Sequence, residues 1–182
     1  MADWSPAMDT SEPVKQRRWW HLRLAERPHA GGARTDGFDL RPIVESDLEA
    51  LAVLMLDAYE GTIDSEGETI VEAREEVGGW LQHEWPNPVC SQVSTVSFGH
   101  DGSANCAVLV SPWEADEVLI GYVITAPANK GSGLGRALVE HTLDLLTARR
   151  IASVRAAITV GNTPSERLFD SVGFTIGSFI TD

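Results

Sequence analysis

The sequence predicts an α/β domain in which helices cover both faces of a mixed, largely antiparallel sheet. A nearly continuous apolar run over residues 118–124 has the length and composition of a buried strand. Glycines follow it, and leucines and alanines then recur at helical spacing over residues 134–148. From residue 38 onward the patterns give the order strand, helix, helix, three strands, helix, strand, helix, strand, which is typical of an α/β fold.

The length and charge of the chain limit what it can be. The 182 residues suffice for one domain, which we place at residues 38–182 after an N-terminal tail at residues 1–37. The formal net charge of −13 argues against nucleic acid as a partner, because phosphates need a basic surface. It favours a cationic acceptor such as an amine, although an acidic surface also serves solubility.

The chain carries neither a membrane signal nor a metal signal. No apolar window reaches the length of a membrane span and no apolar leader opens the sequence, so we expect no membrane contact and a cytoplasmic, bacterial-like protein. Cys90 and Cys106 lie on separate predicted strands without a CxxC or Cys/His cluster. We therefore expect no metal site.

The predicted tail contains one patterned segment, at residues 17–24. There Trp20, Leu22 and Leu24 alternate with polar side chains, as in a short strand or a docking segment. The segment is either a flexible leader whose aromatic rings touch the domain or an arm that pairs with a second subunit. The predicted oligomeric state is accordingly a monomer or a homodimer.

The first elements of the domain are a strand and two helices. Residues 38–44 have the pattern of the first strand. Ser46 and Glu49 have the spacing of a capping box at the start of the first helix. A second helix is predicted from about residue 66 to residue 81.

The middle of the chain is expected to form a hairpin and the central strand. Residues 89–98 alternate as a strand, and residues 104–110 return after a turn. The central strand ends at Pro127, which cannot donate a hydrogen bond to the ladder.

The C-terminal part is predicted to contain a strand, a helix and a last strand. Residues 153–160 form the first of these strands and residues 174–180 the second. Thr163 is expected to cap the helix between them, with proline as its next residue.

A glycine-rich turn joins the central strand to its helix, with glycines at positions 131, 133 and 135. Unpaired N–H groups at the positive end of a helix bind phosphate, and glycines let the backbone approach closely. Lys130 and Arg136 flank the turn and add positive charge. Neither the Walker nor the Rossmann glycine pattern fits, so the turn predicts a phosphate site of another kind.

The turn resembles the pyrophosphate-binding motif of the GNAT superfamily of acyl-CoA-dependent N-acyltransferases. The match is Lys130-x-x-Gly133-x-Gly135, with lysine in place of the usual glutamine or arginine. The chain also resembles the C-terminal motif of that family, where Ser165 stands for a small residue and Phe169 for tyrosine. Four further positions of that motif match in type and spacing, namely Asn162, Leu168, Gly173 and Phe174. With a similar first strand and helix, the likeness spans residues 38–182.

The resemblance implies a cleft where the fourth and fifth strands splay apart, with acetyl-CoA bound there as the acyl donor. The cofactor-binding residues that it implies are Val123, Ile124, Thr125, Lys130, Gly131, Ser132, Gly133, Leu134, Gly135, Arg136, Asn162, Ser165 and Phe169. The connection between the first two helices would roof an acceptor pocket. Its candidate substrate-binding residues are Tyr59, Thr62, Asp64 and Glu68.

The implied reaction is direct attack of an amine, from a small molecule or a peptide, on the thioester. A base is needed, because an alkylamine with a pKa of about 10.4 is almost wholly protonated at neutral pH. Some family members carry a glutamate at the position of Leu119. Glu117, two residues earlier on the same strand face, is our first candidate, and Asp64, Glu60 or a water relay are the alternatives.

The other catalytic roles are assigned by the same resemblance. Phe169 replaces the tyrosine that often protonates the departing thiolate, so Tyr122 or Ser165 would take that role. A backbone N–H near Ile124 would hold the developing oxyanion.

Two further functions compete with an N-acetyltransferase. A non-catalytic acyl-CoA-binding sensor or regulatory module is favoured by Phe169 and Leu119. An interaction protein on a degenerate fold would use residues 17–24 as its contact, but the intact glycine turn argues against it.

Overall fold

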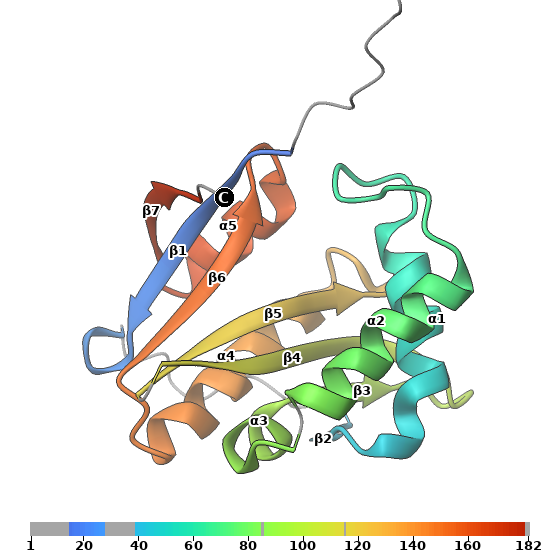
Figure 1. Cartoon of the computed structure of the whole chain (residues 1–182), viewed down its shortest axis with the longest axis horizontal. Helices are drawn as coiled ribbons and strands as arrows, with labels where there is room; N and C mark the ends of the chain where they lie inside the picture. Colours follow the sequence, from blue (N-terminus) through green and yellow to red (C-terminus); the bar gives the residue numbers. More distant parts are fainter. Residues whose placement is uncertain (1–14, 28–38, 85, 115, 181–182) are drawn as a thin grey trace, which may run out of the picture.

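The computed structural model describes residues 15–27, 39–84, 86–114 and 116–180, which form one seven-stranded sheet with helices on both faces (Figure 1). The strand order is β2-β3-β4-β5-β6-β1-β7. Only the β5–β6 pair is parallel, and every other neighbouring pair is antiparallel. The expected α/β fold with a mixed, largely antiparallel sheet is confirmed. The strands are β1 (Arg17–Arg23), β2 (Leu40–Pro42), β3 (Thr95–Phe98), β4 (Ala104–Glu114), β5 (Glu117–Thr125), β6 (Ser153–Thr159) and β7 (Thr175–Phe179).

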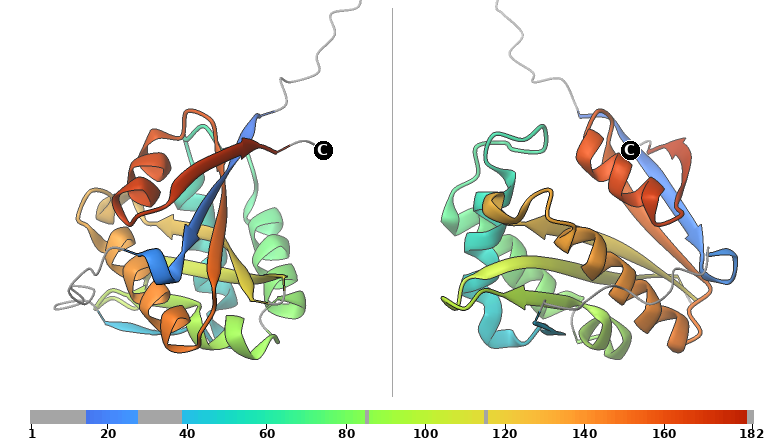
Figure 2. Two further views of the ribbon diagram at one scale, coloured as in Figure 1. Left: turned by 90° about the vertical axis from the view of Figure 1, so that its left-hand side faces the viewer. Right: turned by 180° about the vertical axis from the view of Figure 1, so that it is seen from behind.

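Two apolar clusters, one on each face of the sheet, hold the helices. On one face α1 and α2 pack on β4 and β5 through side chains such as Leu51, Val77 and Leu109, all three almost fully buried. On the other face α3, α4 and α5 cover the sheet, with Leu138 and Phe169 in their cluster (Figure 2). Burial of these faces supplies the main stabilisation of the helices. The helices are α1 (Leu48–Tyr59), α2 (Ile70–His83), α3 (Pro88–Val93), α4 (Leu134–Ala148) and α5 (Thr163–Ser171), and short 3-10 turns are η1 (Leu24–Glu26), η2 (Glu45–Asp47) and η3 (Pro127–Asn129).

Strand β1 corrects the expected domain boundary. This part of the predicted tail lies inside the sheet, between β6 and β7, and pairs antiparallel with both (Figure 1). Trp20 and Leu22 are 7% and 4% exposed, because their alternation directs them into the cluster beneath α4 and α5. The segment is therefore neither a flexible leader nor a free arm. The rest of the predicted tail lies outside the described residues, apart from a few flanking positions.

The predicted strand at residues 89–98 is wrong in its first half. Residues 88–93 form α3, and only residues 95–98 form a strand. Asn87 Oδ1 accepts the N–H groups of Val89 at 2.9 Å and Cys90 at 3.3 Å, which caps the helix with proline at its first position. Cys90 is consequently a buried residue of a helix rather than of a strand.

The expected capping box at Ser46 and Glu49 is replaced by a different start of α1. The turn η2 precedes the helix, and Asp47 Oδ2 accepts the N–H of Val44 at 2.9 Å. A true capping box opens α2, which begins at Ile70 rather than at residue 66. There Glu72 N–H donates to Thr69 Oγ1 and Thr69 N–H donates to Glu72 Oε2.

The cap of α5 also differs from the prediction. Asn162, rather than Thr163, is the capping residue, and its Oδ1 accepts the N–H of Ser165 at 3.1 Å. Thr163 is the first residue of the helix. This cap places the Asn162 side chain at the edge of the cleft described next.

The fourth and fifth predicted strands, β5 and β6, splay apart as expected. Their parallel register runs only from Glu117 opposite Ser153 to Ile120 opposite Ala156. Beyond these pairs the two strands diverge, which leaves the C-terminal half of β5 unpaired on its β6 side. Helix α4 follows β5 after the turn η3, and helix α5 follows β6. Both helices therefore begin at the end where β5 and β6 have diverged.

Candidate functional site

A cavity of about 580 Å³ opens where β5 and β6 diverge. Its floor comes from both strands, one side from α1 and α2, and the other from the start of α5 and from β1. Carboxylates dominate its polar lining. The charged or hydrogen-bonding side chains that line it are Arg17, Tyr59, Asp64, Glu66, Glu68, Glu72, Glu76, Ser111, Tyr122, Thr159, Asn162 and Ser165.

The glycine-rich turn lies at the open end of the same pair of strands. Gly131 and Gly133 have φ values of 78° and 87°, a region that L side chains rarely adopt, and Gly133 immediately precedes α4. A Cβ at either position would meet nothing within 4 Å, so the surface around the turn is open. A Cβ at Gly135 would come within 3.1 Å of Thr125 Oγ1, so the helix approaches β5 closely.

The first turn of α4 presents N–H groups that have no acceptor within the helix, as at any helix start. Leu134 N–H contacts Ser132 Oγ at 3.3 Å, and the Ser132 hydroxyl itself donates to Asn129 O at 2.6 Å. These contacts fix the shape of the turn. The positive end of the α4 dipole then faces open surface, which is the requirement for a phosphate site.

The two cations that flank the turn have partners within the protein. Lys130 Nζ donates to Ala58 O at 2.8 Å and so ties the turn to the last turn of α1. Arg136 Nε donates to Glu140 Oε1 at 2.9 Å. Their positive charge stays next to the turn, while their contacts also have a structural role.

A β-bulge interrupts β5 at the cavity. Leu109 of β4 opposes Tyr122 and Val110 opposes Ile120, so Gly121 is the extra residue. A bulge leaves backbone groups outside the ladder and changes their direction. Gly121 lines the cavity. The sequence reasoning named its neighbours Tyr122 and Val123 but not Gly121, and it expected the oxyanion N–H near Ile124. Ile124 is 1% exposed and packs in the core under α1.

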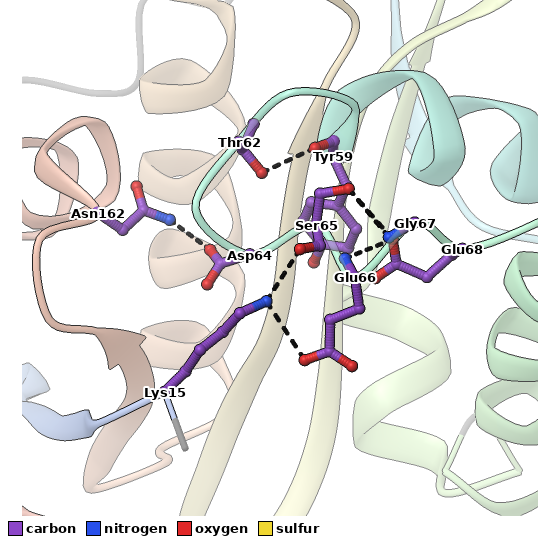
Figure 3. Close-up of polar contacts among 9 residues, drawn as sticks. All are labelled: Lys15, Tyr59, Thr62, Asp64, Ser65, Glu66, Gly67, Glu68 and Asn162. Carbon is purple, nitrogen blue, oxygen red and sulfur yellow. Dashed lines mark hydrogen bonds and ion pairs between the residues drawn. The ribbon is translucent and has the colours of Figure 1, made fainter. Parts of the chain in front are cut away.

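The connection between α1 and α2, residues 60–69, forms the roof of the cavity (Figure 3). Asp64 Oδ2 accepts a hydrogen bond from Asn162 Nδ2 at 2.5 Å, and Asp64 Oδ1 is buried without a partner among the described residues. Glu68 Oε2 accepts the N–H of Glu66 at 3.0 Å. Burial alone would raise the pKa of Glu68, but this and further hydrogen bonds hold it below its ordinary value.

Two tyrosines complete the acceptor side. Burial raises the pKa of Tyr59 well above its ordinary value, and the charge of Asp64 adds to the rise. Burial likewise raises the pKa of Tyr122, whose hydroxyl donates to Glu76 Oε1. Both phenols are therefore protonated at neutral pH and can act as hydrogen-bond donors.

The structure brings only part of the predicted site together. The predicted residues that line the cavity are Tyr59, Asp64, Glu68, Tyr122, Val123, Asn162, Ser165 and Phe169. Thr62 is not among the lining residues, and its hydroxyl donates to Tyr59 O at 2.8 Å. Thr125 Oγ1 lies 3.2 Å from Cys106 Sγ, also outside the cavity.

Glu117 does not reach the cavity, which contradicts its choice as the catalytic base. It lies at the closed end of the cleft, where β5 still pairs with β6. Its carboxylate accepts from Ser153 Oγ at 2.8 Å and Arg155 Nε at 2.6 Å, and it lies 3.4 Å from His21 Nε2. Burial would raise the pKa of Glu117, but these hydrogen bonds and the Arg155 charge hold it below its ordinary value. Glu117 is a structural ion-pair residue.

The sequence reasoning missed four charged residues of the cavity lining, namely Arg17, Glu66, Glu72 and Glu76. Glu72 and Glu76 stand four residues apart, so they share one face of α2, and that spacing could have identified them. Arg17 was missed because it belongs to β1, whose place in the sheet depends on pairing with distant strands. Phe169, at the expected position, packs edge-to-face on Phe174 with ring centroids 4.9 Å apart.

The described residues give no sign of a metal site or a membrane span. In those parts of the chain no three histidine, cysteine or acidic side chains are grouped so that they could hold a metal ion. None of the helices described above has the combination of length and apolar character that crossing a bilayer requires.

Comparison with known proteins matches the acetyltransferase (GNAT) family model to residues 55–174. The [Ribosomal protein bS18]-alanine N-acetyltransferase of Escherichia coli (strain K12) is 34% identical over 59 residues, which are 32% of this chain and 40% of that relative. The matched stretch thus spans well under half of that curated relative.

Solved structures share the fold. A GCN5-related N-acetyltransferase from Sphaerobacter thermophilus superposes with a TM-score of 0.69 and 18% identity, over 92% of this chain and 50% of that one. A ribosomal-protein-alanine N-acetyltransferase from Brucella melitensis gives a TM-score of 0.60 and 25% identity, over 75% of this chain and 84% of that one.

Proposed function

The chain belongs to the acetyltransferase (GNAT) family, and from that membership we propose that it transfers the acetyl group of acetyl-CoA to a primary amine. The observation that carries the proposal is the divergence of β5 and β6 beside the glycine-rich start of α4. The glycine-rich turn offers a phosphate site at the open end of this gap. The cavity with its acidic wall lies where the two strands diverge.

The residues of the turn suit the pyrophosphate of the acyl donor. The N–H groups from Gly131 to Arg136 would bind its oxygens. The positive φ values of Gly131 and Gly133 favour glycine, which has no side chain to occupy that space. The unpaired edge of β5 from Gly121 to Thr125 would hold the pantetheine as an added strand does. This edge would lead from the turn, which lies beside Thr125, to the bulge at Gly121.

The bulge supplies the oxyanion donor in this proposal. Backbone N–H groups at Gly121 and Tyr122 lie where the β4–β5 ladder is interrupted, so they can point at the thioester oxygen as negative charge develops on it. This assignment replaces the N–H near Ile124. Leu119, on the same strand, contributes an apolar side chain to the cavity.

The acceptor side of the cavity selects a cation. Among the described residues, its lining contains five carboxylates, Asp64, Glu66, Glu68, Glu72 and Glu76, and one basic side chain, that of Arg17. An alkylammonium ion is attracted to such a surface before it loses a proton. Amines of small molecules and of peptides are both acceptors to test, and the bS18-alanine relative favours including a peptide that begins with alanine.

Glu76 is the carboxylate that we assign as proton acceptor. It lies next to Tyr122 at the bulge and accepts a hydrogen bond from the Tyr122 hydroxyl. Asp64 lies across the cavity, fixed by Asn162, and is assigned to hold the ammonium group. Tyr122 or Ser165 would protonate the departing thiolate, and Phe169 has no hydroxyl for that step. The absence of this hydroxyl is compatible with turnover, because a thiol of pKa about 8.5 leaves as a stable thiolate.

An acyl-CoA-binding sensor is the second candidate. Phe169, buried against Phe174, favours it, because a common proton donor is missing. The carboxylates of the cavity favour the enzyme, since a sensor needs no binding site for an amine. Location in the cytoplasm and the oligomeric state stay predictions.

The direct experiment is a thiol-release assay with acetyl-CoA and a panel of amines. The panel contains alkylamines, diamines, aminoglycosides and peptides, one of which begins with alanine. The enzyme assignment predicts thiol release that depends on at least one cationic amine. Binding of acetyl-CoA without release for any member would support the sensor instead.

A further inference from the structure

The segment that precedes the N-terminal strand contacts the connection between α1 and α2 through the side chain of Lys15. We propose that Lys15 is a positioning residue for the amine acceptor, because it holds the α1–α2 connection against the opposite wall. The expected change in KM for the amine rests on the proposed function. The effect of Lys15 on the α1–α2 connection can be measured without enzyme activity.

Lys15 bridges two walls of the cavity. It lies two residues before the start of β1, which lies in the sheet beside β6. Its Nζ donates to Ser65 O at 3.0 Å and to Glu66 Oε1 at 3.3 Å, both in the connection (Figure 3). The Lys15 side chain is 27% exposed, against 64% for Glu66, so the contact with the Ser65 carbonyl is the better shielded of the two.

A second bridge ends on the neighbouring residue. Asn162, at the start of α5, donates from Nδ2 to Asp64 while its Oδ1 caps the helix. Side chains of the opposite wall thus hold three consecutive residues, 64–66. Asn162 contacts the first of them, and Lys15 contacts the other two. Figure 3 shows both bridges reaching the connection from the same side.

Apolar packing does little to hold this connection. Its one large apolar side chain, Ile63, is 46% exposed. Gly61 and Gly67 have positive φ values of 70° and 81°, which let the backbone turn at both ends. A segment with few buried apolar contacts opens at low free-energy cost, so the polar bridges determine its position.

The bridges have a consequence for the acceptor. Asp64 Oδ1 is buried in the cavity wall without a hydrogen-bond partner among the described residues, while Oδ2 is held by Asn162. A buried carboxylate oxygen without a partner is costly, and an incoming ammonium group would supply the missing donor. Lys15 acts through this atom, since it holds residues 65 and 66 and thereby the position of Asp64.

The kinetic test is a set of three variants of the full chain. Lys15→Met removes the bridge, and Lys15→Arg keeps a donor and a charge. Arg23→Met is the matched control, because it removes the same charge from the far end of β1, where the Arg23 side chain forms an ion pair with exposed Glu26. We expect Lys15→Met to raise KM for the amine about two- to fivefold, with KM for acetyl-CoA unchanged. Lys15→Arg should restore most of the loss, and Arg23→Met should match the wild type.

The second readout is hydrogen exchange of the amides in residues 61–68, measured without substrates. Lys15→Met should speed their exchange about two- to fivefold, while exchange in α4 stays the same. If exchange and KM for the amine both match the wild type, the proposal is overturned. If the exchange rate rises but no amine is acetylated even by the wild type, the proposed function has failed and the bridge itself stands.

Discussion

Asn162 Nδ2 donates a hydrogen bond to Asp64 Oδ2 at 2.5 Å across the mouth of the cleft. The same asparagine caps α5 through its other amide atom. One side chain therefore links the helix that borders the acyl end to the connection that roofs the acceptor. This link joins the two halves of the proposed site.

Asn162→Asp separates the two roles of that side chain. Aspartate caps a helix as well as asparagine does, but it cannot donate to Asp64 and adds a repelling charge. We expect a melting temperature within a few degrees of the wild type and a KM for the amine raised about tenfold. Asn162→Ala, which loses the cap as well, should cost a further ~1 kcal/mol of unfolding free energy. Equal amine KM values for Asn162→Asp and the wild type would refute the link.

Gly133→Glu tests the phosphate site. The side chain would fill the space in front of α4 and repel the pyrophosphate, so we expect acetyl-CoA binding to be lost. Gly102→Glu is the matched control, because Gly102 lies in the β3–β4 turn with a φ of 81° and a Cβ there also meets nothing within 4 Å. Both variants carry the same backbone strain, of about 1–2 kcal/mol. Loss of binding in both would mean that strain alone is responsible.

The carboxylates of the cavity have separable roles. Glu76→Gln should lower kcat about a hundredfold or more with little change in KM, because it removes the proton acceptor. Asp64→Asn should mainly raise KM for the amine. Glu75→Gln is the control, since Glu75 is the exposed neighbour of Glu76 on α2 and does not line the main cavity. A larger fall in kcat for Asp64→Asn than for Glu76→Gln would reverse the two assignments.

Glu117 is expected to affect stability rather than catalysis. Its folded pKa is lowered, so its ion pairs stabilise the fold above the pKa of the unfolded carboxyl, about 4.3, and that stability is lost as pH falls below it. Glu117→Gln should lower the unfolding free energy at pH 7, and the gap from the wild type should shrink toward pH 3. Denaturant titrations at the two pH values measure this. A gap that stays constant, or a large loss of kcat in the folded variant, would contradict the assignment.

Trp20 tests whether β1 belongs to the folded sheet. Trp20→Ala removes a side chain that is 7% exposed, and we expect a loss of about 3–5 kcal/mol of unfolding free energy. Trp113→Ala removes a ring that is 42% exposed and should cost much less. Equal effects in a denaturant titration would mean that β1 contributes no more than a surface contact.

Local sequence signals predicted the elements whose pattern is self-contained. The apolar run of β5, the glycines before α4 and the closing turn after α5 each carry their own signal, and all three lie where the sequence places them. The short segment 89–93 failed because alternation over five residues does not distinguish a strand from a helical turn. The helix-start signal of Asn87 and Pro88 outweighs this alternation.

The errors in the site come from contacts between distant segments. The face of β5 that Glu117 occupies was predicted correctly, but where β6 stops pairing with β5 is not encoded in that strand. The place of β1 depends on Ala156 and Ile176, which pair with Trp20 from the other end of the chain. The position of Lys15 follows from that pairing, so its contact with Ser65 could not be predicted.

The most direct test of the central claim is calorimetric titration of the purified protein with acetyl-CoA, with CoA as a parallel ligand. The account predicts micromolar binding to the wild type and to Gly102→Glu, and none to Gly133→Glu. Absence of binding to the wild type at millimolar acetyl-CoA would contradict it, because the turn before α4 would then bind no acyl donor.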